Sequence, residues 1–279
     1  MNLNKIKRDN LGTIELDKLK LESLKIQRKA KYNSFSFIYN NKKYFFKRCH
    51  SINSIYNELL AELLAKDFGI KSAHYDLASY EGMIGTVSED FLMDGDNFYH
   101  ISEIVSDKHN NIDSIITKLK EKYPNKDIIE KLKAEIMDIL IFDILIANHD
   151  RHNENMGIIE NDDEIKFCPI YDNELMLDYR SIYNGEYSLD IDNSESDENL
   201  IYKILYSADD TYLNKLKSKL SIISPENITT KLEEIEEKIG VEINPNIKNN
   251  IQEGFEINYK SINNKLKENT TLVKTKKRD

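Results

Sequence analysis

Apolar and polar positions alternate or recur at helical spacing in the first ninety residues, and the pattern divides them into short elements. It predicts strand 34–38, turn Asn40-Asn41, strand 43–47, helix 51–68, strand 74–79, turn Glu81-Gly82 and strand 83–87. Ser54 is the expected N-cap of the helix, and Gly69 is the expected stop. This order predicts a small, mostly antiparallel sheet with one helix packed on it.

The pattern changes after residue 91, where helical spacing dominates. It predicts helix 127–147, a polar segment 148–155, strands 156–159 and 165–171, and then helices only. Ser224-Pro225 is a typical helix start, Gly240 a typical stop, and a further helix begins near Pro245. We therefore predict an α+β protein with a β-rich N-lobe at 1–92, which includes an extension at 1–30. A mostly helical C-lobe follows at 93–279, with a flexible basic tail at 270–279.

Composition and charge narrow the function classes. The 279 residues carry a formal net charge of −10, which argues against non-specific binding to nucleic acid. Cys49 and Cys168 are far apart and show no metal-like spacing, as expected in a reducing compartment. The longest apolar run, 136–147, is interrupted by Asp138 and Asp143 and is too short to span a bilayer. Together with the charged N-terminus, this predicts a cytoplasmic protein without a membrane partner.

The polar segment 148–155 carries the strongest chemical signal, because phosphoryl transfer needs a carboxylate base, oxygen ligands for Mg²⁺ and a lysine for the phosphates. Asp150 would be the base. Asn155, five residues later, and Asp172, at the end of the following hairpin, would hold the metal. A hairpin brings its two ends together, so we expect these side chains to face one site.

At this point the sequence resembles the HipA-like serine/threonine protein kinases. Asp150, His152 and Asn155 match the family's Asp-x-His-x-x-Asn core, and Tyr171-Asp172 resembles its metal-binding Tyr-Asp. Residues 57–70 resemble the family's Asn-Glu helix, with the same Leu-Ala and Gly ending. Together these motifs cover roughly residues 30–175 in the family's order. The resemblance implies a two-lobed, protein-kinase-like fold and places His152 beside Asp150 at the catalytic centre, where it would contact phosphate or support the loop.

The resemblance also implies the ATP-binding residues. Lys47 would be the N-lobe lysine, and Glu58 on the following helix would hold its ammonium over the phosphates, with Lys43 and Glu62 as rivals. Ser88-Glu89-Asp90-Phe91 resembles the hinge whose backbone meets adenine, so Glu89, Asp90 and Phe91 are assigned to ATP binding. No glycine-rich loop precedes Lys47. The resemblance implies that a loop with Arg28, Lys29, Lys31 and Ser34 takes its place, because HipA-like proteins often use a Ser- and Lys-containing phosphate loop.

Structural interpretations of the same residues stay open. Asp150 and Asn155 could cap a turn, and Glu58 could serve only as a capping-box partner. His149 and His152 are three residues apart, but zinc would need a helix and a third ligand there. Arg151 is expected to make a salt bridge that fixes the loop. The aromatic residues of strands 34–38 and 43–47 are expected to form the lobe core, although one of them could stack on adenine.

Taken together, the sequence predicts an ATP- and Mg²⁺-dependent serine/threonine protein kinase. The resemblance implies autophosphorylation, a toxin-like role, an unidentified protein substrate and an antitoxin-like partner. Three alternatives remain: a pseudokinase that acts as a binding module, a metal phosphohydrolase of the HD type built on His149-Asp150 with His100 and His109, and a kinase of small molecules.

Overall fold

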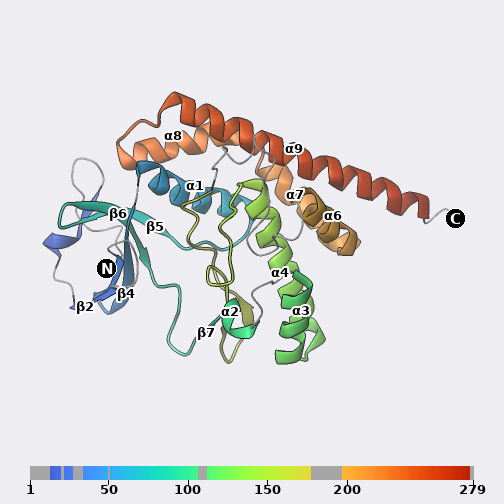
Figure 1. Ribbon diagram of the computed structural model, residues 1–279, viewed down its shortest axis with the longest axis horizontal. Coiled ribbons are helices and arrows are strands. Elements are labelled where there is room, and N and C mark those ends of the chain that lie inside the picture. Colours follow the sequence, from blue (N-terminus) through green and yellow to red (C-terminus); the bar gives the residue numbers. More distant parts are fainter. Residues whose placement is uncertain are drawn as a thin grey trace.

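The computed structural model describes residues 13–19, 22–27, 34–49, 51–105, 112–176 and 197–276 (Figure 1). Its strands are β1 (Ile14–Glu15), β2 (Glu22–Gln27), β3 (Ser34–Tyr39), β4 (Lys42–Arg48), β5 (Tyr75–Tyr80), β6 (Met83–Glu89), β7 (Asn97–His100), β8 (Gly157–Glu160) and β9 (Ile165–Phe167). Its helices are the 3-10 turn η2 (Leu16–Lys18), α1 (Ile52–Phe68), α2 (Ile101–Ile104), α3 (Ile112–Lys122), α4 (Lys126–Leu145), α6 (Asp197–Ser207), α7 (Asp210–Ile222), α8 (Asn227–Ile239) and α9 (Pro245–Lys276).

The N-terminal strands form one sheet in the order β1-β5-β6-β4-β3-β2. Only β1 and β5 run parallel within it, which confirms the predicted mostly antiparallel sheet. The predicted turn at Asn40-Asn41 is present, and both residues have positive φ, as a tight hairpin turn requires. The sequence pattern did not predict β1 and β2, which are the two edge strands.

Strand alternation gives the sheet two faces with different roles. One face carries the cluster Ile14, Leu16, Phe35, Phe37, Tyr44, Phe46, Ala78 and Val87. Successive side chains of a strand point to opposite faces, so Phe45 and Lys47, which alternate with Tyr44 and Phe46 on β4, belong to the opposite face. Ser34 on β3 is paired directly with Lys47, so both side chains lie on this second face.

Helix α1 begins one turn earlier than its predicted cap. Ser51, not Ser54, is the N-cap, because the Ser51 side chain accepts a hydrogen bond from the backbone N–H of Ser54, and Ser54 itself is buried. Gly69 ends the helix in the left-handed conformation, as predicted. The helix packs against β5 and also against α7 and α8. Its buried side chains therefore belong to the same core as the C-terminal helices.

The second part of the chain is mainly helical, with the small sheet β7-β8-β9 on one side of α4 (Figure 1). A β-rich N-terminal part and a helical C-terminal part confirm the predicted α+β fold. β7 was not predicted, and β9 ends at Phe167 rather than at residue 171. Helix α9 continues to Lys276, so most of the predicted tail at 270–279 is helical, while 277–279 lie outside the described residues. No described helix is long and apolar enough to cross a membrane.

Candidate functional site

Arg151 is the centre of a buried polar network beneath the segment 148–155. The guanidinium makes two bonds of 3.0 Å to the Asp143 carboxylate, and neither side chain is exposed. Its Nη1 donates to the carbonyl oxygens of Asn155 at 3.0 Å and Tyr171 at 2.7 Å, and its Nη2 donates to Asn173 Oδ1 at 2.6 Å. One side chain thus holds the segment around Asp150 next to the segment that follows β9. The predicted loop-fixing salt bridge of Arg151 is confirmed.

The loop that carries Asp150 follows α4 through Ala147, whose positive φ of 49° turns the chain out of the helix. Asn155 Nδ2 donates to the carbonyl oxygen of Asp150 at 3.1 Å, which leaves the amide oxygen of this buried side chain for a ligand. His152 Nδ1 accepts from the backbone N–H of Glu154 at 3.2 Å, so Nε2 is the nitrogen that carries the proton. His152 therefore stabilises the loop through one nitrogen and keeps a donor on the other.

The segment after β9 places Asp172 beside the sheet. Asp172 has a φ of 59°, and its backbone N–H donates to the hydroxyl of Tyr75 on β5 at 3.1 Å. Its carboxylate lies 2.5 Å from the Lys47 ammonium on β4. The neighbouring Tyr171 hydroxyl donates to the carbonyl oxygen of Glu154 at 2.6 Å. Asp172 is therefore attached both to the N-terminal sheet and to the loop of Asp150.

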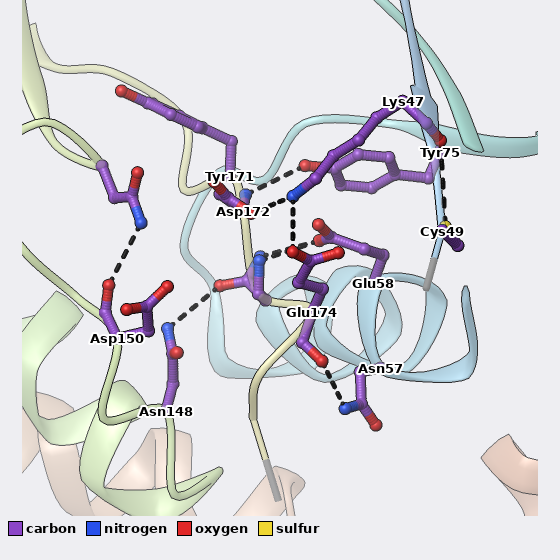
Figure 2. A network of polar contacts seen from close by, with 12 residues as sticks. Lys47, Cys49, Asn57, Glu58, Tyr75, Asn148, Asp150, Tyr171, Asp172 and Glu174 are labelled. Atoms are coloured by element: carbon purple, nitrogen blue, oxygen red, sulfur yellow. Dashed lines mark hydrogen bonds and ion pairs between the residues drawn. The ribbon is translucent and has the colours of Figure 1, made fainter. Parts of the chain in front are cut away.

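Two neighbouring residues of α1 hold the same segment from the other side (Figure 2). Asn57 Nδ2 donates to the carbonyl oxygens of Glu174 at 2.7 Å and Met176 at 2.8 Å. Glu58 Oε2 accepts from the backbone N–H of Asn173 at 3.0 Å. The Asn-Glu pair singled out in the sequence thus acts on the backbone around Asp172.

The partners of Lys47 differ from the prediction. Its ammonium pairs with Asp172 at 2.5 Å and with Glu174 at 3.0 Å, and within the described ranges no ion pair joins it to Glu58 (Figure 2). The reason is that the Glu58 carboxylate is buried beneath the segment and is used by Asn173. Burial lowers the pKa of Lys47, but the two carboxylates more than offset this effect and raise it above its ordinary value.

The rival residues are engaged elsewhere. Lys43, on the interior strand β4, pairs with Asp90 at 2.8 Å, and its side chain is half exposed. Glu62 binds His74 at 2.6 Å and the backbone N–H of Tyr75. Lys47 is thus the lysine that the structure brings to Asp172.

In the predicted hinge, the acidic side chains make contacts of their own and have to be considered apart from the backbone. The Glu89 side chain pairs with Lys42, and Glu89 is opposite Tyr44 on the face of the sheet away from Lys47. The Asp90 side chain is held by Lys43. The carboxylates of the predicted hinge therefore fasten it to β4, and an adenine contact there would have to come from its backbone.

Two aromatic side chains stand out near this site. The Phe91 ring lies 5.8 Å from the ring of Tyr171 and 5.9 Å from that of Phe98, so it connects the hinge to the segment of Asp172. Phe45 lies on the same face as Lys47, whereas the other aromatic residues of β3 and β4 up to Phe46 belong to the opposite core. Phe45 is thus the aromatic residue of these strands that shares a face with Lys47, and the Lys43 ammonium lies 4.6 Å from the centre of its ring.

The predicted phosphate loop lies between β2 and β3. Lys31 falls outside the described residues. Ser34, the first residue of β3, is paired with Lys47 on one side and with Gln27 on the other. Ser34, where β3 begins, is therefore next to Lys47, which is where phosphates would have to be contacted.

The donor set at this site fits Mg²⁺ rather than zinc. Asn155 offers an amide oxygen and Asp172 a carboxylate, which are hard oxygen ligands. In the described part of the chain no group of three or more His, Cys, Asp or Glu side chains could hold a metal ion. His149 and His152 lie in a loop and His100 is the N-cap residue of α2, so these described histidines form no zinc or HD-type site with one another; His109 lies outside the described residues.

Sequence reasoning missed several residues of this site. They are Tyr75, Asp143, Asn148, Asn173 and Glu174. The signal for Asp143 was present, because a carboxylate within an apolar helix run needs a buried partner. Tyr75 gave no such signal, since a tyrosine in a strand is ordinary.

Glu58 predicts a pH dependence of stability. Burial raises the pKa of its carboxyl to about 7, although the N–H of Asn173 opposes this. The folded protein therefore holds this proton to a higher pH than the unfolded chain, and the associated stability is lost as the pH rises from about 4.5 to 7. In Glu58→Gln, the free energy of unfolding from urea titrations should fall less over this range, by on the order of 2 kcal/mol. Parallel curves for the variant and the wild type would contradict the shift.

Known proteins resemble this chain in sequence and in fold. The family model described as the HipA-like C-terminal domain matches residues 24–243. Serine/threonine-protein kinase CtkA of Helicobacter pylori strain J99 is 26% identical over 163 residues, which cover 51% of this chain and 49% of that protein. The match thus spans about half the length of this curated relative.

Two solved structures share the fold. The proinflammatory kinase CtkA of Helicobacter pylori has a TM-score of 0.67 at 16% identity, covering 94% of this chain and 99% of that chain. A chain from the Shewanella oneidensis complex of HipA, HipB and operator DNA has a TM-score of 0.55 at 14% identity, covering 84% and 64% respectively. At these identities the likeness shows the fold alone.

Proposed function

The chain belongs to the family of HipA-like C-terminal domains, and from this membership and the geometry of the site we propose that it is an ATP- and Mg²⁺-dependent protein kinase acting on serine or threonine. The observation that carries the proposal is the position of Arg151. By donating to the carbonyl oxygens of Asn155 and Tyr171 from one nitrogen, it keeps the loop of Asp150 beside Asp172, which in turn contacts Lys47. The similarity to CtkA, named a serine/threonine-protein kinase, supports the same activity.

Each side chain then has a defined task. Bound Mg·ATP supplies the γ-phosphate that is transferred. Asp150 accepts the proton of the acceptor hydroxyl, and Asn155 and Asp172 hold the metal through oxygen atoms. Lys47 neutralises phosphate charge, while Arg151 keeps these groups in place without touching the substrate. His152 supports the loop of Asp150 through Nδ1, and its Nε2–H is available to a phosphate oxygen.

The phosphate loop and the hinge complete the proposal. Lys31 and Ser34 would contact the phosphates from the loop before β3, and the backbone at Glu89, Asp90 and Phe91 would meet adenine. The ring of Phe45 would cover one side of the base. Glu58 would support ATP binding indirectly, because it holds Asn173 next to Asp172.

We extend the proposal to autophosphorylation and to an antitoxin-like protein partner. The Shewanella oneidensis relative in fold comes from a toxin–antitoxin system of HipA and HipB with operator DNA, which is the ground for the proposed partner. Autophosphorylation is proposed from the resemblance to the HipA-like kinases. No direct contact with nucleic acid is proposed for this chain, because its net charge of −10 opposes one.

The test is phosphate transfer by the purified protein. With γ-labelled ATP and Mg²⁺, we expect label on serine or threonine of the protein itself or of a generic protein acceptor, and none when the metal is chelated. Phosphoamino acid analysis identifies the acceptor side chain. Nucleotide binding without transfer would favour the pseudokinase alternative, and release of inorganic phosphate without labelled protein would favour a hydrolase.

A further inference from the structure

Lys47 is held by a carboxylate that lies after Asp172, on a different element from the helix expected to supply it. Glu174 Oε1 is 3.0 Å from the ammonium, while Glu58 on α1 is bonded to the backbone of Asn173 (Figure 2). The side chain of Glu174 is 11% exposed. Asp172 and Glu174 thus reach the lysine together from the same short segment.

The position of Glu174 is fixed by its own contacts. Asn57 Nδ2 donates to its carbonyl oxygen at 2.7 Å, which fastens the residue to α1. Its second carboxylate oxygen, Oε2, is buried and has no hydrogen-bond partner within the described ranges. Glu58 Oε1 is in the same position, so burial alone does not separate the two carboxylates. What separates them is the Lys47 ammonium, which lies 3.0 Å from Glu174 Oε1 and makes no ion pair with Glu58 within the described ranges.

On the basis of the proposed function, we infer that Glu174, rather than Glu58, is the carboxylate that orients Lys47 toward the nucleotide phosphates. If Asp172 held the metal, as proposed, it would share its charge with the metal and hold the lysine less firmly. Glu174 would keep its charge and its position, and so would continue to direct the ammonium. Glu58 has a separate task, which is to hold Asn173 and hence the backbone beside Asp172. Glu174 is therefore a positioning residue that acts through Lys47.

The test compares the isosteric variants Glu174→Gln and Glu58→Gln, each alone and combined with Lys47→Ala. With Lys47 present, we expect Glu174→Gln to lower kcat for phosphate transfer by about 10–100-fold and to change the Kd for Mg·ATP by less than about threefold. Combined with Lys47→Ala, it should lower kcat further by less than about twofold, because it has no lysine left to act on. Glu58→Gln should lower kcat by the same factor in both backgrounds.

Matched variants guard against general effects. Glu233→Gln makes the same charge change on the exposed face of α8 and should leave kcat and Kd unchanged. Glu174→Asp keeps the charge but shortens the side chain, and its kcat should lie between those of the wild type and Glu174→Gln. Thermal unfolding of each variant shows that it is folded.

Several results would overturn the inference. It fails if Glu174→Gln slows transfer equally with and without Lys47, or if the effect of Glu58→Gln is the one that disappears in Lys47→Ala. It also fails if Glu174→Gln is as active as the wild type. If the wild-type protein binds Mg·ATP but does not transfer phosphate, the distance between Lys47 and Glu174 is measured in a crystal structure of the nucleotide complex, for the wild type and the same variants. A Lys47–Glu174 distance beyond ion-pair range in the wild type rejects the inference. A wild-type protein that neither binds nor turns over Mg·ATP overturns the proposed function and this inference with it.

Discussion

Asp150→Asn is expected to lower the rate of phosphate transfer by about 10²–10⁴-fold, because an amide cannot accept the proton of the acceptor hydroxyl. The binding of Mg·ATP should change by less than about threefold, since Asp150 acts in the transition state rather than in nucleotide binding. The substitution is isosteric, and the backbone carbonyl of Asp150 that Asn155 Nδ2 uses is retained. Transfer is measured with γ-labelled ATP under single-turnover conditions, and binding by calorimetry.

The matched control is Asp163→Asn, which makes the same change in an exposed turn between β8 and β9. It should transfer phosphate at the rate of the wild type. Equal labelling of Asp150→Asn and wild type would remove Asp150 from the catalytic role, and loss of nucleotide binding in Asp150→Asn would show that the carboxylate serves the metal.

The second large effect concerns stability. Arg151→Met should reduce the free energy of unfolding by about 3–5 kcal/mol, because it leaves the Asp143 carboxylate buried without its cation. The carbonyl oxygens of Asn155 and Tyr171 lose their donor at the same time. The double variant Asp143→Leu/Arg151→Met removes the isolated charge and should regain part of the loss. Urea unfolding monitored by circular dichroism gives these differences.

In the variants of Arg151 and Asp143, we expect stability to recover without a recovery of phosphate transfer. Even where Asp143→Leu/Arg151→Met is well folded, phosphate transfer should stay low, because the loop of Asp150 is no longer fastened to the segment of Asp172. Lys118→Ala, which breaks an exposed pair with Glu121, should change the free energy of unfolding by less than about 0.5 kcal/mol. A single variant Arg151→Met as stable and as active as the wild type would contradict the role given to this side chain.

The elements that the sequence predicted well are those with a clear local pattern. The hairpin of β3 and β4 has alternating aromatics and an Asn-Asn turn, and α4 has a regular apolar spacing. β1 has only two residues and β7 only four, and in β2 the alternation is limited to Leu24 and Ile26, so these three strands were not recognised without the tertiary partners that pair with them.

The residues of the site could be predicted where the chemistry requires a particular residue type. The contacts between them could not be predicted where they depend on how distant segments pack. Arg151 as a loop-fixing residue followed from its place among polar neighbours, and the structure confirms this. That Lys47 meets Glu174 rather than Glu58 could not be derived, because it depends on how the segment after Asp172 lies against α1. The assignments of Asp150, Asn155 and Asp172 to catalysis and metal binding stay predictions until the experiments above are done.

The packing of α1 limits the ways in which the proposed kinase can be regulated. In many protein kinases, activity is controlled by the position of the corresponding helix. Here Leu59, Leu60, Leu64 and Phe68 are each at most 2% exposed, and burying each contributes about 1.5–3 kcal/mol. Swinging the helix outward would expose them all, at a cost well above the 1–3 kcal/mol that an effector typically supplies. Inhibitors or effectors should therefore act by blocking the entry of substrates, and compounds selected to displace α1 should fail to move it.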